Sequence, residues 1–346
     1  MGYDEVSKFG RITNLNYILF LVVIVIYTGA FNRMYSQGIN LTGLEQTWNE
    51  DFQFSLVVKK IKTEISILSD NRYNSFRIPI DIHYHLNTHK KQFNKALNSI
   101  VTLSRKKNVD LILANFNHNL SLNNYNVKRE EIVENWSEIL ALLKGDISNI
   151  YIDIANEPNL YPTEWEQTGT YIIKKIREKN PNIKIIYGAS NYNSLYELSR
   201  SEPLKFSNII YAFHFYEPYV FTHQGTSWTG NQTKTINIPF PYPTLDTIKM
   251  PPLHPDVLGT PGEINYKDYH LTGTFQAVED KISIMNQWSM KYGVEVWCTE
   301  YGVSINADKN SREIYLKCVR EKLAKYKIEG FIWEYTGNFG ISELKL

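Results

Sequence analysis

Two carboxylates stand at the ends of two strand-like segments of this 346-residue chain. Glu157 follows the mainly apolar run Tyr151–Ala155, and Glu300 lies near the end of Val294–Gly302. Pro158 cannot continue a hydrogen-bonded ladder, so the first strand is predicted to end in Asn156-Glu157-Pro158. Parallel α/β proteins gather their chemistry at the carboxyl ends of buried strands. Two carboxylates that meet there can provide an acid and a nucleophile or base, as cleavage of a glycosidic bond requires.

Polar and aromatic side chains follow most of the other strand-like segments. In chain order they are Arg77, Asn117, His118, Asn156, His214, Tyr216, Trp333 and Glu334. Aromatic rings offer flat platforms for sugar rings, and amides bind hydroxyls. In glycoside cleavage one carboxylic acid protonates the leaving oxygen, while the other carboxylate attacks the sugar or activates water. This set of residue types therefore indicates a sugar-cleaving site.

Strands and helices alternate from about Met34 onward, and the pattern predicts eight βα units. The predicted strands are Ser36–Leu44, Ser75–Ile80, Val109–Asn117, Tyr151–Asn159, Asn182–Ser190, Ser207–Pro218, Val294–Gly302 and Gly330–Gly337. The predicted helices are Phe54–Leu68, Phe93–Lys107, Glu130–Lys144, Glu164–Asn180, Ser194–Arg200, Phe275–Tyr292 and Ser311–Tyr326. Continuous apolar strands are typical of a parallel sheet covered on both faces. The regular alternation favours a closed (β/α)8 TIM barrel over an open doubly wound sheet.

Two stretches depart from this regular alternation. The segment after the last predicted strand is too short for a closing helix, so we expect the barrel to lack a full last one. Tyr219–His270 shows no regular pattern but is rich in aromatic residues and prolines, and loops of this length are usually functional or disordered. We expect it to form an ordered cleft wall, in which Trp228 either stacks on a sugar ring or holds the loop against the barrel.

Composition excludes several classes of function. The chain has 37 basic and 36 acidic side chains, a formal net charge of +1, and no basic stripe, so a nucleic-acid partner is not expected. No glycine-rich phosphate loop follows a predicted strand, which argues against a nucleotide cofactor. Cys298 and Cys318 are expected to be unpaired, Cys298 as a small packed apolar residue. No cofactor and no metal are expected.

The amino-terminal segment predicts export. Residues 1–16 are mostly polar, Tyr17–Tyr27 is a continuous apolar run, and small residues follow it. This pattern is typical of a signal peptide, although residues 15–31 could also form a short membrane anchor. We therefore expect a signal peptide or anchor over residues 1–30 and a catalytic domain over residues 34–346, secreted or held at the outside of the cytoplasmic membrane.

Five short motifs occur in order at predicted strand ends: FRIP, NEP, HFYEP, TEYG and FIWEY. With the run FTHQGTSW they make the chain resemble glycoside hydrolase family 5, the cellulase family of clan A, from Gly38 to Gly340. The resemblance implies a retaining mechanism, in which the two carboxyl groups lie about 5–5.5 Å apart. It also implies that Glu157 is the general acid/base and Glu300 the nucleophile.

The resemblance gives roles to the supporting residues as well. Arg77 would hold Glu300 ionised, and Asn156 would bind the sugar 2-hydroxyl. His214 and Tyr216 would orient the two carboxylates, and Trp333 would form the floor of the subsite where the bond breaks. The third strand departs from the family pattern Asp-x-His-His, because this chain has Asn115-Phe116-Asn117-His118. His118 is still expected to contact sugar.

Other polar groups can have structural roles instead of catalytic ones. Asp153 is expected to be a buried structural partner low in the barrel, and Glu334 either binds a sugar hydroxyl or closes an ion pair. His83, His85 and His89 resemble a metal set, but their spacing is more typical of surface or cleft-wall residues.

The sequence thus predicts a retaining endo-glycoside hydrolase of β-linked polysaccharide, with β-1,4-glucan as the expected substrate. The alternatives are a transglycosylase or exopolysaccharide-processing enzyme, a mannanase or xyloglucanase of the same family, and a non-catalytic carbohydrate-binding barrel.

Overall fold

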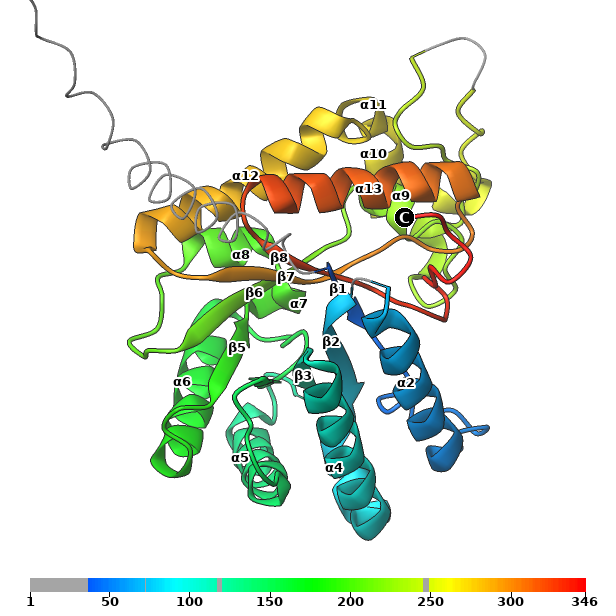
Figure 1. Ribbon diagram of the computed structural model, residues 1–346. Coiled ribbons are helices and arrows are strands. Elements are labelled where there is room, and N and C mark those ends of the chain that lie inside the picture. The colour runs from blue at the N-terminus through cyan, green and yellow to red at the C-terminus, as the bar shows by residue number, and fades with distance from the viewer. Residues whose placement is uncertain (1–36, 72, 117–119, 245–248) are drawn as a thin grey trace, which may run out of the picture. The chain divides into compact units, whose positions relative to one another are not determined.

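Eight parallel strands close into a barrel in the order of the chain (Figure 1). The computed structural model describes residues 37–71, 73–116, 120–244 and 249–346. The strands are β1 (Gln37–Asn40), β2 (Tyr73–Ile80), β3 (Asp110–Asn115), β4 (Ile150–Asp153), β5 (Lys184–Gly188), β6 (Ile209–Phe215), β7 (Val296–Tyr301) and β8 (Glu329–Ile332). The predicted (β/α)8 architecture is confirmed. Closure places the carboxyl ends of all eight strands on one rim, where distant parts of the sequence meet.

The strands are buried on both faces, as their apolar sequences predict. On β3, Leu111 and Leu113 belong to the large core shared with the helices, whereas Ile112 belongs to a separate apolar cluster. That second cluster comprises Ile112, Tyr151, Ile186, Ile210, Ala212, Trp297 and Phe331. Successive strand side chains point to opposite faces, so this cluster fills the barrel interior and supports the site from below.

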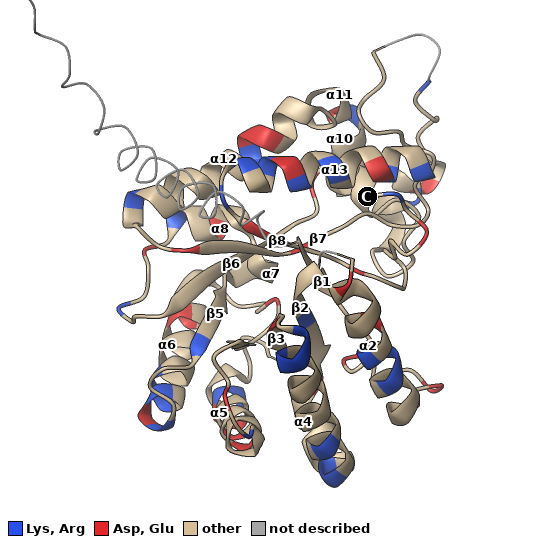
Figure 2. Ribbon diagram, in the orientation of Figure 1, with Lys and Arg blue, Asp and Glu red and all other residues tan. Residues whose placement is uncertain are grey.

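The main outer helices match the predicted helical segments. They are α2 (Phe54–Ser69), α4 (Lys90–Lys107), α5 (Tyr125–Leu142), α6 (Pro162–Lys179), α8 (Leu195–Arg200), α12 (Phe275–Tyr292) and α13 (Lys309–Lys325). Basic and acidic side chains both lie along these helices, in keeping with the balanced net charge (Figure 2). No helix among the described residues is long and apolar enough to cross a membrane.

Several short helices were not predicted. They are α3 (Ile82–Thr88), α7 (Ser190–Asn193), α9 (Tyr219–Thr222), η1 (Gly230–Thr233), η2 (Pro255–Val257), α10 (Pro261–Lys267) and α11 (Tyr269–Thr272). Segments of one or two turns are too short to reveal a helical period, and local groups specify them instead. Thr260 caps α10 through the amide of Gly262, and Pro261 occupies its first turn. The described residues between Tyr219 and His270 are therefore more regular than their sequence suggests.

The chain after β8 forms hydrogen-bonded turns, and the described residues 333–346 contain no helix, as predicted. Phe339 and Ile341 are buried in this segment. Cys298 and Cys318 are buried and unpaired, also as predicted. The proposed signal or anchor segment lies outside the described residues.

Candidate active site

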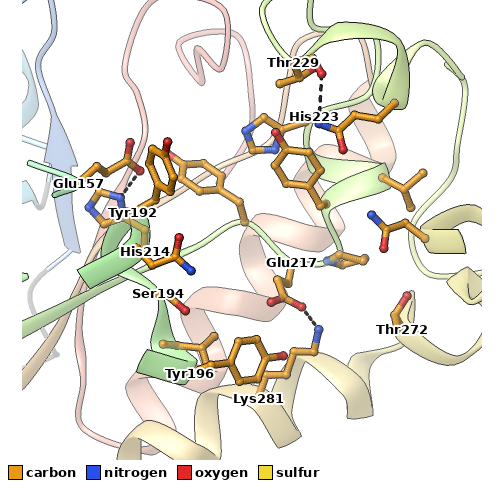
Figure 3. Close-up of a pocket in the computed structure, with 18 of the residues that line it drawn as sticks. Glu157, Tyr192, Ser194, Tyr196, His214, Glu217, His223, Thr229, Thr272 and Lys281 are labelled. Atoms are coloured by element: carbon orange, nitrogen blue, oxygen red, sulfur yellow. Dashed lines mark hydrogen bonds and ion pairs between the residues drawn. The ribbon is translucent and has the colours of Figure 1, made fainter. Parts of the chain in front are cut away.

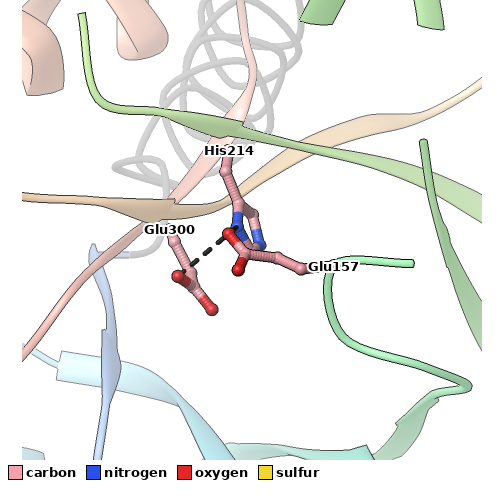
Figure 4. Close-up of side chains that lie close together, drawn as sticks. All are labelled: Glu157, His214 and Glu300. Carbon is pink, nitrogen blue, oxygen red and sulfur yellow. Dashed lines mark hydrogen bonds and ion pairs between the residues drawn. The ribbon is translucent and has the colours of Figure 1, made fainter. Parts of the chain in front are cut away.

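Glu157 and Glu300 face one another at the carboxyl end of the barrel (Figure 4). A carboxyl oxygen of each and a ring nitrogen of His214 all lie within 4.8 Å of one another. Glu300 belongs to β7 and is 4% exposed, whereas Glu157 follows β4 and is half-buried. Glu157 also has a left-handed backbone, with φ of 44°. Non-glycine residues rarely adopt this conformation, and where they do it often marks a functional site.

Irregular strand pairing helps to aim these groups. The register between β6 and β7 shifts between Phe213 and His214, which sets His214 opposite Glu300. The register between β7 and β8 shifts between Cys298 and Tyr301, a span that includes Glu300. Bulges of this kind occur next to active sites because they redirect a side chain without ending the sheet.

His214 connects the two carboxylates. Its Nδ1 lies 2.8 Å from Glu157 Oε1 and 3.4 Å from Glu300 Oε2. The amide nitrogen of Asn193 donates to Nε2 at 3.0 Å, so the ring proton resides on Nδ1 and is donated to Glu157. Burial lowers the pKa of His214 to about 4, although the neighbouring Glu300 opposes this change. The imidazole is therefore neutral near pH 7 and acts as a fixed hydrogen-bond donor.

Arg77 is the buried cation beneath the site. It is fully buried on β2, and its guanidinium donates to Glu300 at 2.7 Å and twice to Asp153, at 2.8 and 3.0 Å. It also donates to Asn40 at 2.9 Å and to Asn156 at 2.7 Å. Burial alone would lower the pKa of Arg77, but the two carboxylates raise it. Asp153 is thus the buried structural partner that the sequence predicted.

Glu300 sits in an environment with opposing electrostatic effects. Burial raises its pKa, and the charge of Glu157 acts in the same direction. Arg77 lowers the pKa through its charge and its hydrogen bond, and the Tyr216 hydroxyl donates to the other carboxyl oxygen at 2.9 Å. The ionised form therefore depends on the hydrogen bonds from Arg77 and Tyr216.

The remaining predicted residues surround this network. Arg77 occupies the side-chain oxygen of Asn156, which leaves the amide nitrogen as the donor for a ligand. Trp333 is half-buried and stacks on Phe116 with ring centroids 5.9 Å apart, and the Arg77 guanidinium lies over the same Phe116 ring. His118 lies outside the described residues, so its predicted contact is not tested.

A cavity of about 930 Å³ opens beside Glu157 (Figure 3). Among the predicted site residues, Glu157, His214, Tyr216 and Trp228 line it. Trp228 is 58% exposed, and its ring lies 6.2 Å from that of Phe339. The volume is near the upper end of the range for small-molecule sites.

The sequence did not single out the other lining residues, among them Tyr192, Glu217, His223 and Lys281. Glu217 belongs to the HFYEP motif and His223 to the FTHQGTSW run, so the motifs alone could have marked both residues as candidates for the site. Tyr192 and Lys281 come from a short turn and a long outer helix, and no local pattern marks them.

The structure also shows the contacts of Glu334 and of the histidines near β2, for which the sequence left structural roles open. Glu334 is 4% exposed and accepts from the Thr42 hydroxyl and the Phe339 amide, and no ion pair to it is seen among the described residues. His85 is buried and bonds the Leu44 carbonyl oxygen at 2.7 Å through Nε2. Within the described part of the chain, Glu157, His214 and Glu300 are the acidic and histidine groups close enough to share an ion. The set His83, His85 and His89 is not among them.

Comparison with known proteins agrees with this geometry. The cellulase family, glycosyl hydrolase family 5, has a sequence model that matches residues 33–339. The chain belongs to this family. It is 27% identical over 340 residues to endoglucanase 3 of Fibrobacter succinogenes, a match that covers 89% of this chain and 50% of that protein. The chain thus spans about half the length of that relative.

Solved structures share the family fold. Endoglucanase Cel5A from the hyperthermophilic Thermotoga maritima superposes with a TM-score of 0.72 at 20% identity, over 90% of this chain and 93% of that one. The clostridial cellulose synthase subunit Z from Clostridioides difficile superposes with a TM-score of 0.68 at 23% identity, over 89% and 94% of the two chains. At these identities the likeness establishes the fold.

Proposed function

We propose that this family 5 member is a retaining endo-glycoside hydrolase that cleaves a β-linked polysaccharide by double displacement. The observation that carries the proposal is the approach of a Glu157 oxygen to within 4.8 Å of a Glu300 oxygen. Retaining enzymes separate their carboxyls by about 5–5.5 Å, whereas inverting enzymes leave about 6.5–9.5 Å for a water molecule. The space between these two groups fits a sugar carbon and its leaving oxygen, without an intervening water.

In the first step a carboxylate oxygen of Glu300 attacks the anomeric carbon. The bond from that carbon to the leaving oxygen breaks, and Glu157 transfers its proton to that oxygen, which departs as a hydroxyl group. In the second step the Glu157 carboxylate takes a proton from water, and the water oxygen attacks the same carbon. The ester bond to Glu300 then breaks, which releases the sugar with its original configuration and restores both groups.

The supporting residues act through the contacts already described. Arg77 and Tyr216 keep Glu300 ionised and fixed in orientation, because each donates to a different carboxyl oxygen. Neutral His214 holds Glu157 by a single donated hydrogen bond. We assign the sugar 2-hydroxyl to the amide of Asn156 and the sugar ring in the cleavage subsite to Trp333. Trp228 provides a further stacking surface on the cavity wall.

We assign β-1,4-glucan as the substrate, cleaved within the chain. The matched family is the cellulase family, and the relative from Fibrobacter succinogenes is named an endoglucanase, which supports this assignment. Reducing-end release from soluble β-glucan, mannan and xyloglucan tests it. Release from β-glucan well above that from mannan is expected, and release from mannan alone would reject the glucan assignment. Product analysis with and without added acceptor sugar separates hydrolysis from transglycosylation.

We also propose that the protein is exported, either cleaved and secreted or anchored through residues 15–31. The apolar run from Tyr17 to Tyr27 supports this proposal. Cell fractionation with mass spectrometry of the mature amino terminus tests it. Recovery of full-length protein in the cytosol alone would contradict it.

A further inference from the structure

Three consecutive residues after β5 adopt a left-handed backbone. Asn191, Tyr192 and Asn193 have φ of 52°, 61° and 54°. This conformation costs roughly 1–2 kcal/mol per non-glycine residue, and asparagine tolerates it best because its side chain can bond locally. Tyrosine has no such compensation. A run of this kind persists only where its surroundings hold it, and it marks a candidate functional segment.

The turn is anchored to the candidate active site at both ends. The Tyr192 amide donates to the Pro158 carbonyl oxygen at 3.4 Å, next to Glu157. Asn193 is fully buried and donates to His214, and Ser194 forms an isolated bridge with the same histidine. These contacts account for the position of Asn193. They leave Tyr192 52% exposed, as a lining residue of the cavity beside Glu157.

The position of the cavity indicates which part of a substrate it would hold. Its lining includes Glu157 but neither Glu300 nor Trp333. In the proposed reaction Glu157 protonates the leaving oxygen, so the leaving half of the substrate lies on its side of the pair. The cavity is therefore on the leaving-group side of the site.

An ion pair stands at the far side of the cavity from Glu157 (Figure 3). Lys281 of α12 pairs with Glu217, which follows β6. Their side chains are 22% and 29% exposed, so both groups reach the cavity while most of each is shielded from water. An ammonium group donates to sugar hydroxyls and a carboxylate accepts from them, so the pair can bind a neutral sugar through both partners.

We propose that Tyr192 and the Lys281–Glu217 pair form a binding site for the sugars of the leaving chain. The inference rests on the proposed hydrolase function and adds the residues that select the leaving group. Tyr192 stacks on a sugar ring, and the contacts of the left-handed turn to Pro158 and His214 hold its side chain at the cavity for that purpose. The ligand is a neutral β-linked oligosaccharide, because hydroxyl, amide and aromatic groups make up most of the remaining lining.

The test compares two substrates that share the reacting sugar. In cellopentaose the leaving group is a sugar chain. In β-cellobiosyl fluoride the leaving group is a fluoride ion, so no sugar of this substrate occupies the cavity. The ratio of kcat/KM for cellopentaose to that for the fluoride should fall by about two- to tenfold in Tyr192→Gly, the value of one aromatic contact. It should fall by roughly tenfold or more in Lys281→Ala, the value of a charged hydrogen bond.

Three comparison variants complete the design. Glycine accepts φ near 60°, so Tyr192→Gly should keep its melting temperature, and Tyr192→Phe should keep the wild-type ratio because the ring remains. Tyr161 is 65% exposed but does not line the cavity, and Lys322 pairs with Glu279 elsewhere. Tyr161→Ala and Lys322→Ala should leave the ratio unchanged.

Cleavage position gives a second readout that does not depend on the amount of folded enzyme. With cellopentaose labelled with ¹⁸O at the reducing end, Lys281→Ala should shift labelled product from cellobiose toward glucose. An unchanged ratio removes that residue from the proposed site, and an equal loss on both substrates makes its role structural, which overturns the inference. A wild-type enzyme that cleaves neither substrate overturns the proposed function first and the inference with it.

Discussion

Replacement of Arg77 by methionine removes the cation on which the buried network depends. The side chain makes five hydrogen bonds, to Asn40, Asp153, Asn156 and Glu300. Asp153 is 0% exposed and Glu300 is 4% exposed, so the variant would bury two carboxylates without a compensating cation. Removal of one partner from a buried ion pair costs about 3–5 kcal/mol. We expect Arg77→Met to lower the free energy of unfolding by at least this amount at pH 7.5.

The penalty should depend on pH. Without Arg77, burial holds the folded-state pKa values of Asp153 and Glu300 well above their unfolded values. The folded variant then keeps protons that the unfolded chain releases, so its stability falls as pH rises above about 4.5. Each such carboxyl contributes about 1.4 kcal/mol per pH unit until its folded-state pKa is reached. The gap between variant and wild type should therefore be smaller at pH 5 than at pH 7.5.

Urea unfolding followed by tryptophan fluorescence at pH 5, 6, 7 and 8 measures both effects. Arg177→Met is the matched control, because Arg177 donates to backbone carbonyl oxygens of Pro181, Ile183, Ser207 and Asn208. Loss of these contacts leaves no carboxylate without its counter-charge. The decrease in the free energy of unfolding of Arg177→Met should therefore be the same at every pH. A penalty for Arg77→Met below about 1 kcal/mol, or one that does not change with pH, would show that Arg77 does not compensate the buried charges of Asp153 and Glu300.

Three further predictions concern the two catalytic carboxylates, Tyr216 and the buried Glu45. Glu300→Gln and Glu157→Gln should each lower turnover of glucan by roughly a thousandfold or more, with melting temperatures close to wild type. On an aryl glycoside, whose leaving group needs no proton, Glu157→Gln should lose far less activity than on glucan. Equal losses on the two substrates would contradict the acid role of Glu157. Tyr216→Phe should lower kcat about tenfold by removing one hydrogen bond to Glu300, and steady-state kinetics with unchanged values would exclude that contact from catalysis. Burial raises the pKa of Glu45 to about 7, so the folded state keeps this proton after the unfolded chain has lost it near 4.5. Stability should fall by about 3 kcal/mol between pH 4.5 and 7, and Glu45→Gln should abolish that part of the dependence in urea unfolding; an unchanged pH profile would contradict it.

The barrel and its two carboxylates could be predicted because both follow from strand order. Each strand is a short apolar run bounded by polar or proline residues, and closure brings every carboxyl end to one rim. Glu157, Glu300 and Arg77 therefore had to lie close together once eight βα units were recognised. Asp153 as a buried partner followed from its position within an apolar strand.

Other parts of the site depend on geometry that no local pattern contains. His214 reaches both carboxylates because of a one-residue register shift beside it. The left-handed turn at Tyr192 is set by contacts to Pro158 and His214, which are distant in sequence. Lys281 stands on an amphipathic helix whose exposed lysines look alike in sequence. Only the folded chain distinguishes the one that faces Glu217.

The most direct test of the account is covalent labelling with an activated 2-deoxy-2-fluoro-β-cellobioside, which slows the second step and allows the glycosyl-enzyme to accumulate. Peptide mass spectrometry should find one 2-deoxy-2-fluorocellobiosyl group attached to Glu300, with Glu157 unmodified. No label, or a label on Glu157, would contradict the assignment of Glu300 as the nucleophile.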